Sequence, residues 1–238
     1  MADFNTHILG ATVVISLGAT CCTKLLDLGI SDGLMLTMVG VVGGILPDID
    51  LKQSQPSRVL FSLLGIVSAL AVLFANIPDY SAFELWLGAL LIYAFVRYPL
   101  WWLFHTTTTH RGALHSVAAA LMVGVLIAAV SWQFLAVTAL LSWLLGIFMT
   151  AGYLIHLTLD QLYSVDFSGV KIRRSFGSAL KPMDFDKIPA SCLILFVTGL
   201  AWFWTAPYME AWNEWLLYHT DWQSRLLPDW VLQWNAAP

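Results

Sequence analysis

The sequence predicts an all-α protein, a polytopic transmembrane helical bundle with about seven membrane segments. Hydrophobic residues make up 59% of the 238 residues and charged residues 11%, and the mean hydropathy is +0.75. A soluble domain carries roughly a quarter charged residues, so this composition excludes an ordinary soluble protein. The apolar residues also form long segments, several of them near the roughly 20 residues that a spanning helix needs.

The first two apolar segments, residues 8–23 and 33–46, are short for full crossings and contain several glycines. Small residues let helices approach closely in a bilayer, so we expect a tightly packed hairpin with its turn at residues 27–33. Longer apolar segments follow at residues 58–77, 83–104, 114–130, 134–154 and 188–206.

Two domains are expected from this order. Residues 1–206 form the membrane-embedded domain, and residues 207–238 form a tryptophan-rich interfacial tail, because tryptophan prefers the membrane–water boundary. Cys21, Cys22 and Cys192 lie in or beside apolar segments and indicate no disulfide framework.

Four short polar motifs interrupt the apolar sequence. If each segment crosses once, all four reach the same face of the membrane. The motifs are Thr6-His7, Leu46-Pro47-Asp48-Ile49-Asp50, the stretch from His110 to Ser116, and the stretch from His156 to Asp160. Ionisable groups beside membrane spans usually mark a site, and imidazole with carboxylate is a ligand set that divalent metals prefer. The sequence therefore predicts a membrane-embedded metal site.

The basic residues indicate which face this is. Most Lys and Arg residues lie on or near the motif side, whereas the other side has mainly Asp and Glu. By the positive-inside rule, we expect the motif face and the N-terminus to be cytoplasmic and the C-terminus to be outside.

His156 and Asp160 are four residues apart at the end of an apolar segment, which stacks their side chains on one helix face. An ordinary hydrogen-bonded pair would have the same spacing. His110 and His115 bracket a turn into the next helix. Arg111 between them either anchors the topology or holds an anionic group such as a phosphate. His105, before a run of threonines, is a candidate supporting residue.

Pro47 can end the preceding helix and free Asp48 and Asp50 from helical geometry. In an extended stretch, residues two apart point the same way, so both carboxylates would face one centre. A solvated helix-ending turn is the alternative. Paired carboxylates with imidazoles can hold one or two divalent ions that activate water, and we assign Asp50 and Arg111 as catalytic candidates.

At these motifs the chain resembles the YdjM-like family of bacterial membrane-bound metal-dependent hydrolases, some of which are regulated by LexA. The resemblance rests on His7, on Gly43-Gly44-Ile45-Leu46-Pro47-Asp48-Ile49-Asp50, on the stretch from His110 to Ser116, and on Gly152-Tyr153 through Asp160. With Gly169-Val170 and Pro182, it covers about residues 7–182. It implies a multi-pass protein of the bacterial inner membrane.

The family is distantly similar to zinc-dependent phospholipase C and the S1/P1 nucleases, all-helical enzymes whose metals are held by His and Asp. This similarity implies a divalent ion, zinc before manganese or magnesium, with a ligand pool of His7, Asp48, Asp50, His110, His115, His156 and Asp160. Two features depart from the pattern. The stretch from Asp166 to Pro182 is long, and the soluble enzymes use a processed N-terminal amino group, whereas no cleavable signal is visible here.

Three functions remain open. The leading hypothesis is a metal-dependent hydrolase of phosphoester bonds that acts on a phosphorylated or lipid substrate, with membrane lipids as its surroundings. The alternatives are a divalent-metal or proton transporter, and a non-catalytic, metal-stabilised membrane protein of a stress response. Motifs at span ends favour the enzyme over a transporter, whose site would lie at mid-membrane. The small basic patch does not indicate nucleic-acid binding, and the sequence does not predict an oligomeric state.

Overall fold

The computed structural model describes residues 4–50, 55–107, 112–163, 165–166, 171–172, 180–217 and 225–226. Most of these residues are helical. The rest form loops and one antiparallel pair of two-residue strands, β1 (Val165–Asp166) and β2 (Lys171–Ile172). The prediction of an all-α membrane bundle is confirmed. The chain divides into two compact units, the first comprising residues 1–45 and 115–238 and the second residues 46–114.

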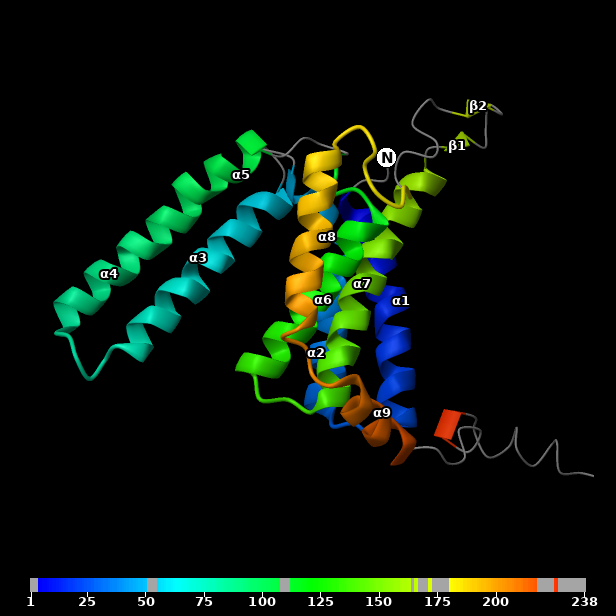
Figure 1. The fold of residues 1–238 in the computed structure, drawn as a ribbon, viewed down its shortest axis with the longest axis horizontal. Helices are drawn as coiled ribbons and strands as arrows, with labels where there is room; N and C mark the ends of the chain where they lie inside the picture. Colours follow the sequence, from blue (N-terminus) through cyan, green and yellow to red (C-terminus); the bar gives the residue numbers. More distant parts are fainter. Residues whose placement is uncertain are drawn as a thin grey trace, which may run out of the picture. The chain divides into compact units, whose positions relative to one another are not determined.

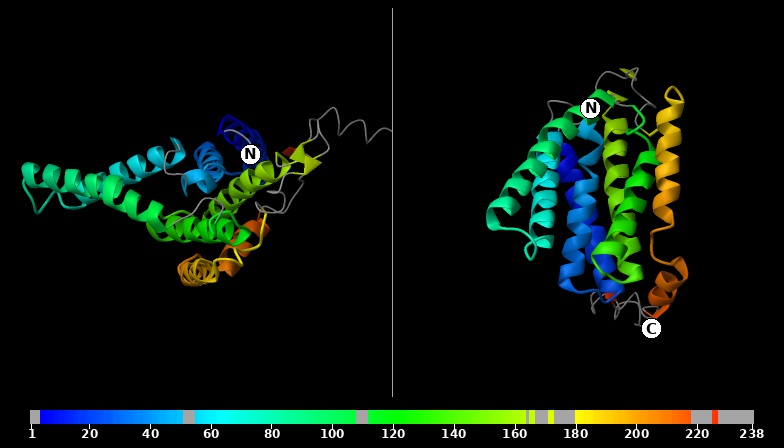
Figure 2. Two further views of the ribbon diagram at one scale, coloured as in Figure 1. Left: turned by 90° about the horizontal axis from the view of Figure 1, so that it is seen from above. Right: turned by 60° about the vertical axis from the view of Figure 1, so that its left-hand side comes forward.

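The first unit contains six helices among its described residues. Figures 1 and 2 show α1, α2, α6, α7 and α8 running side by side as a bundle. The shorter α9 lies beside the first residues of α7. Their bounds are α1 Phe4–Leu25, α2 Ile30–Gly43, α6 Val117–Phe134, α7 Ala139–Leu162, α8 Ile188–Trp202 and α9 Tyr208–Leu217.

The second unit is a helical hairpin that follows a short 3-10 helix, η1 (Leu46–Asp50). Its first arm is α3 (Gln55–Ala75), and its second arm is α4 (Ala82–Phe95), a π-helical turn η2 (Val96–Leu100) and α5 (Trp101–Thr107). Pro99 lies inside the π turn. Proline has no N–H to donate and clashes with the carbonyl four residues earlier, which explains why the regular helix is interrupted there.

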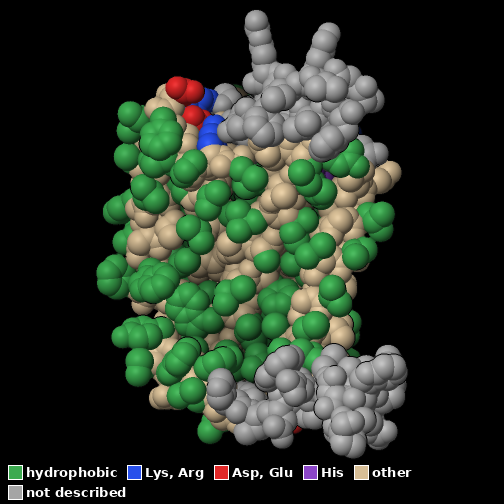
Figure 3. Space-filling view, turned by 90° about the vertical axis from the view of Figure 1, so that its right-hand side faces the viewer, with side chains coloured by type: hydrophobic (Ala, Val, Ile, Leu, Met, Phe, Trp, Pro, Cys, Tyr) green, Lys and Arg blue, Asp and Glu red, His purple; other side chains and the backbone are tan. Residues whose placement is uncertain are grey.

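Among the described residues, five helices are long and apolar enough to cross a membrane. Two shorter apolar helices, α2 and α8, bring the total to the seven expected segments. Many large apolar side chains on them are exposed, as expected for surfaces that face lipid. On the face in Figure 3, hydrophobic side chains cover the middle and the charged side chains in view lie toward the ends.

Two of the helices begin later in the chain than predicted. The segment expected at 134–154 is α7, which begins after its N-cap Thr138 and continues to Leu162, so that His156 and Asp160 lie inside the helix. The segment expected to begin at residue 114 begins at Val117, because the Ser116 side chain accepts a hydrogen bond from the backbone N–H of Ala119 and caps α6. Side-chain caps therefore moved both starts beyond the points that hydrophobicity alone indicates.

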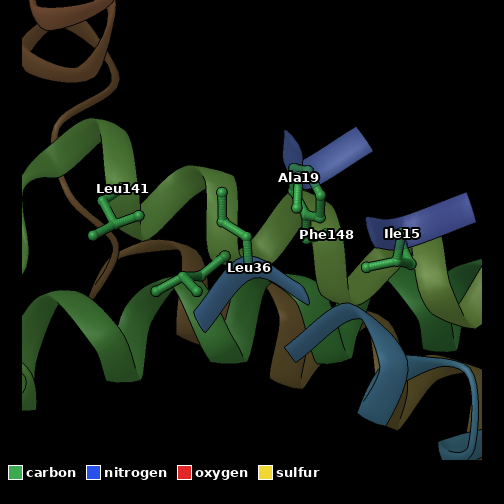
Figure 4. Packing of buried hydrophobic residues seen from close by; sticks show 6 residues of the cluster. Ile15, Ala19, Leu36, Leu141 and Phe148 are labelled. Carbon is green, nitrogen blue, oxygen red and sulfur yellow. The ribbon is translucent and has the colours of Figure 1, made fainter. Parts of the chain in front are cut away.

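The core of the first unit lies where α7 packs against α1 and α2. Figure 4 shows the side chains that meet there, from Ile15 and Ala19 of α1, Leu36 of α2, and Leu141 and Phe148 of α7. Because α7 is also the most buried of the candidate spans, polar residues on its inner face are held away from lipid.

The segment after α8 is tied to the start of α7. Glu214 of α9 accepts a hydrogen bond from the backbone N–H of Leu140 at 2.7 Å, and the indole of Trp143 donates to the carbonyl of Ala206 at 3.1 Å. Arg225 donates to the carbonyl of Leu25 at the C-terminus of α1. The predicted interfacial tail lies mostly outside the described residues, and the division at residue 206 stays a prediction.

Candidate metal centre

The start of α1 and the end of α7 bring three ionisable side chains together inside the first unit. They are His7, His156 and Asp160, whose exposed fractions are 2%, 1% and 0%. One ligand atom from each lies within 4.8 Å of the other two. Placing three such groups in a dry interior is costly unless they bind one another or an ion.

The spacing within this cluster suits a shared ion. His7 Nε2 lies 3.4 Å from Asp160 Oδ1, which is long for a hydrogen bond. Two ligand atoms bound at about 2.1 Å and separated by a tetrahedral angle lie about 3.4 Å apart. The other His7 ring nitrogen, Nδ1, is buried and has no hydrogen-bond partner in the described part of the chain. A buried polar atom of this kind calls for a water or an ion, so the residues fit a divalent metal.

The two imidazole rings are stacked. The rings of His7 and His156 lie 3.7 Å apart between centroids, with an angle of 12° between their planes. The stacking therefore brings imidazole groups from the start of α1 and the end of α7 to one place.

A backbone carbonyl orients His156. Its Nδ1 lies 2.8 Å from the carbonyl oxygen of Gly44, just after α2. A carbonyl only accepts, so Nδ1 carries the proton and Nε2 carries the lone pair. Histidines that bind metals are usually held in this way, with the second ring nitrogen donating to a carbonyl or carboxylate.

Missing side chains explain why the carbonyl comes so close. A Cβ on Gly152 of α7 would lie 1.8 Å from the Gly40 carbonyl oxygen, and one on Gly43 would lie 2.3 Å from the Met149 carbonyl oxygen. Both values are impossible for real atoms, so α2 and α7 touch backbone to backbone only because glycine stands at these positions. The paired glycine motifs in the sequence thus position Gly44 against His156.

His115 adds a second imidazole beside His156. It is fully buried, and its ring centroid lies 6.0 Å from that of His156 at an angle of 73°. The loop at residues 181–182 covers this end of α6, because the carbonyls of Lys181 and Pro182 accept hydrogen bonds from the backbone N–H groups of Val117 and Ala118. The first unit therefore gathers His7, His115, His156 and Asp160 at one end of the bundle.

The aspartate motif differs from its predicted geometry. Residues 46–50 form the 3-10 helix η1 rather than an extended stretch, with Pro47 inside it. The expected extended stretch is therefore wrong, and a common centre for the two carboxylates stays a prediction. Asp48 belongs to the second unit and follows Gly44 by four residues in the chain. The side chain of Asp50 lies outside the described residues, as do His110 and Arg111.

His105 belongs to a separate network in the second unit. Its Nδ1 lies 2.8 Å from the Trp101 carbonyl oxygen, and its Nε2 lies 3.1 Å from Ser57 Oγ, which also accepts from the Trp101 indole. The carbonyl requires a proton on Nδ1, so Ser57 donates to Nε2. With both ring nitrogens engaged, His105 joins α3 to α5.

Sequence reasoning undervalued two parts of the site. A lone histidine near the start of an apolar segment is usually an interface residue, so the first motif was weak evidence that His7 is a ligand. The Gly44 carbonyl was missed altogether. The glycines before Pro47, read together with Gly152, were the available signal, since they predict the backbone contact that brings this carbonyl to α7.

One comparison with known proteins gives a match. The family model of the YdjM inner membrane protein matches residues 1–219, which include every described residue of the cluster. No curated protein and no solved structure matches this chain. Because the match covers most of the chain, the protein belongs to the YdjM inner membrane protein family.

Proposed function

We propose that this protein is an integral-membrane, metal-dependent hydrolase that cleaves phosphoester bonds. The observation that carries the proposal is the buried cluster of His7, His156 and Asp160, with His115 beside it. These side chains offer nitrogen and oxygen ligands and no thiolate, which suits zinc and also tolerates manganese or magnesium. Asp48, Asp50 and His110 remain proposed members of the same ligand set.

The chain's own residues have distinct proposed roles. Asp160 supplies negative charge that attracts a cation, and the Gly44 carbonyl keeps the Nε2 lone pair of His156 available. A divalent ion bound there supplies Lewis acidity toward a phosphoryl oxygen and activates water. Asp50 is the proposed acceptor for the proton of the attacking water, and Arg111 is the proposed partner for the charge that develops on the phosphoryl group.

The position of the cluster favours an enzyme over a transporter. His7 is the fourth residue of α1, and Asp160 lies two residues before the end of α7. Both are therefore at span ends, at the depth of the lipid headgroups, whereas a transit site would lie near mid-membrane. We accordingly propose an amphiphilic phosphoester as the substrate class and membrane lipids as the surrounding partners.

Metal content tests the binding part of the proposal. The protein purified in detergent is loaded with zinc, passed through a desalting column, and its bound metal is measured by mass spectrometry. His156→Gln is expected to lower the bound metal strongly. His105→Gln is the matched control, because it removes a histidine that is equally buried but lies in the Ser57–Trp101 network. Equal zinc in both variants would reject the cluster as the site.

Hydrolysis is tested separately on the zinc-loaded protein. A phospholipid and a water-soluble phosphodiester are offered with and without a chelator, and phosphate-containing products are measured. The proposal expects chelator-sensitive turnover that His156→Gln abolishes. Zinc transport into sealed vesicles without any turnover would instead identify a transporter, and neither activity in a zinc-binding protein would identify the metal-stabilised alternative.

We also propose that the site faces the cytoplasm. Basic residues are concentrated on the motif side, whereas acidic residues dominate the other. A periplasmic phosphatase reporter fused after Pro238 should be active, and the same reporter fused after Lys52 should be inactive. The reverse pattern would place the site outside.

A further inference from the structure

A groove of about 330 Å³ runs along the lipid-facing side of α6 and α7. Leu121 and Val125 of α6 and Ile147 and Leu154 of α7 form its walls. At one end it reaches Trp143 and Trp202, whose rings meet edge to face at 5.1 Å between centroids. Its volume is in the range of ligand-binding pockets, which begin at roughly 300 Å³.

Two glycines face each other at the floor of the groove. A Cβ on Gly124 would lie 2.7 Å from the Gly146 carbonyl oxygen, and one on Gly146 would lie 2.6 Å from the Gly124 carbonyl oxygen. The two helices therefore touch backbone to backbone at the floor of the groove.

The walls of the groove offer few polar groups to a ligand, and two of their donors are already used. The hydroxyl of Thr150 donates to the Gly146 carbonyl at 2.9 Å, and the indole of Trp143 donates to the Ala206 carbonyl at 3.1 Å. Apart from the Trp202 indole, the other lining side chains are apolar or absent. Such a surface suits hydrocarbon better than a polar ligand, whose groups would find few partners there.

The length of the groove selects a lipid chain. Leu154 comes eleven residues after Trp143, which corresponds to about 16 Å of helix. This is close to one leaflet of hydrocarbon, about half of the roughly 30 Å core. The groove is also continuous with the lipid-facing surface, because Leu121, Ile147 and Trp202 are each at least half exposed.

The opposite end of the groove points to the metal-binding cluster. Leu154 comes two residues before His156 on α7, and Leu121 comes six residues after His115, next to the start of α6. The groove and His156 lie on different sides of α7. Both nevertheless reach the level at which α6 begins and α7 ends, where the centroids of the His115 and His156 rings are 6.0 Å apart. A headgroup on a chain in the groove would therefore lie level with these histidines.

We propose that this groove binds one acyl chain of a membrane lipid phosphoester and so holds its phosphate at the metal-binding end of α6 and α7. This inference rests on the proposed function and adds the substrate class, a lipid rather than a soluble phosphoester. The groove offers no hydrophobic gain over the bilayer itself, because lipid tails are equally apolar. Its contribution is orientation, which raises the rate by holding the scissile bond in place.

Photo-crosslinking tests the groove without requiring activity. The protein is placed in bilayer nanodiscs of phosphatidylethanolamine and phosphatidylglycerol that contain some phosphatidylglycerol with a diazirine on one acyl chain. Cross-links should concentrate on the peptides of α6 and α7 that line the groove. Val125→Trp fills the groove and should abolish these cross-links, whereas Val130→Trp, on the same helix but outside the groove, should not. Cross-links spread evenly over all lipid-facing helices would overturn the proposal.

A second variant distinguishes a filled groove from a misfolded protein. Ile147 is 57% exposed to lipid, so Ile147→Trp fills the groove from outside without entering the helix contact. Loss of the groove cross-links in a correctly inserted Ile147→Trp protein supports the proposal, and their persistence there contradicts it.

Kinetics separate this inference from the proposed function. Val125→Trp should lower kcat/KM for the long-chain phosphoester and leave that for bis-p-nitrophenyl phosphate unchanged. An equal loss on both substrates, or no loss on either, would contradict the groove while hydrolysis itself stands. Absence of turnover in the zinc-loaded wild-type protein would contradict the proposed function, and the cross-links would then still decide whether the groove binds lipid.

Discussion

Gly152→Ala tests whether the contact between α2 and α7 positions the cluster. The new Cβ would lie 1.8 Å from the Gly40 carbonyl oxygen, and real Cβ atoms do not approach closer than 3.0 Å. The helices must therefore separate by at least 1.2 Å at this point. If Gly44 moves with α2, the same displacement lengthens the 2.8 Å contact between its oxygen and His156 Nδ1 to about 4.0 Å, beyond hydrogen-bonding range.

Two costs should follow from this separation. Overpacking a helix contact destabilises the fold by about 1–3 kcal/mol. Loss of the buried hydrogen bond adds about 1–3 kcal/mol, and removing the group that orients a metal-binding histidine typically lowers metal affinity by about 10–100-fold.

Thermal unfolding in detergent and zinc titration against a chelating dye measure the two effects. Gly199→Ala is the matched control, since a Cβ at this position of α8 meets nothing within 4 Å. We expect Gly152→Ala to lower both the unfolding temperature and the zinc affinity, and Gly199→Ala to lower neither. Wild-type stability and zinc affinity in Gly152→Ala would refute the role of this contact.

Three further predictions concern other parts of the chain. Glu214→Gln in α9 removes the carboxylate that caps the start of α7, and it should lower the free energy of unfolding by about 0.5–2 kcal/mol. Thermal unfolding measures this, and the control is Glu210→Gln, at an exposed residue in the first turn of α9, which should change stability little. Arg111→Gln should lower the rate of hydrolysis by roughly 10²–10³, with Arg111→Lys less impaired, and full activity in the glutamine variant would return Arg111 to a topological role. Zinc affinity should fall as the solution is acidified, because protons compete for the imidazole ligands, and an affinity independent of pH would argue against histidine binding.

The sequence was sufficient for the fold class because the bilayer restricts what an apolar segment can form. Segments such as residues 58–77 have only the helix available to satisfy their backbone in lipid, so composition alone predicts them. Helix ends were predicted less well. The caps at Ser116 and Thr138 act through single hydrogen bonds, which hydropathy does not detect.

Part of the candidate site also followed from the sequence. The spacing of His156 and Asp160 predicts a shared helix face, and the single-crossing count brings His7 and His115 to the same end. The geometry of Asp48 was not predictable in this way, because proline ends an α-helix without dictating whether an extended or a 3-10 stretch follows. The role of the Gly44 carbonyl depends on the packing of α2 against α7, which no local pattern specifies.

The separate network of His105 shows why histidine alone is a weak signal. His105 and His156 are both buried, and each has Nδ1 at 2.8 Å from a backbone carbonyl oxygen. The two histidines differ in their other partners. His105 Nε2 lies beside the Ser57 hydroxyl, whereas His156 belongs to the cluster with His7 and Asp160. What makes a candidate metal centre is therefore the combination of ligands, which only the fold reveals.

The most direct test of the account is X-ray absorption spectroscopy of the zinc-loaded protein in nanodiscs, which measures the atoms bound to the metal and their distances. The account predicts one shell of nitrogen and oxygen atoms at about 2.0–2.2 Å with the outer scattering of at least two imidazole rings. In Asp160→Asn we expect weaker zinc binding and a changed shell, and in His156→Gln weaker imidazole scattering. Sulfur at about 2.3 Å, or no bound zinc at saturation, would contradict a centre built from His7, His156 and Asp160.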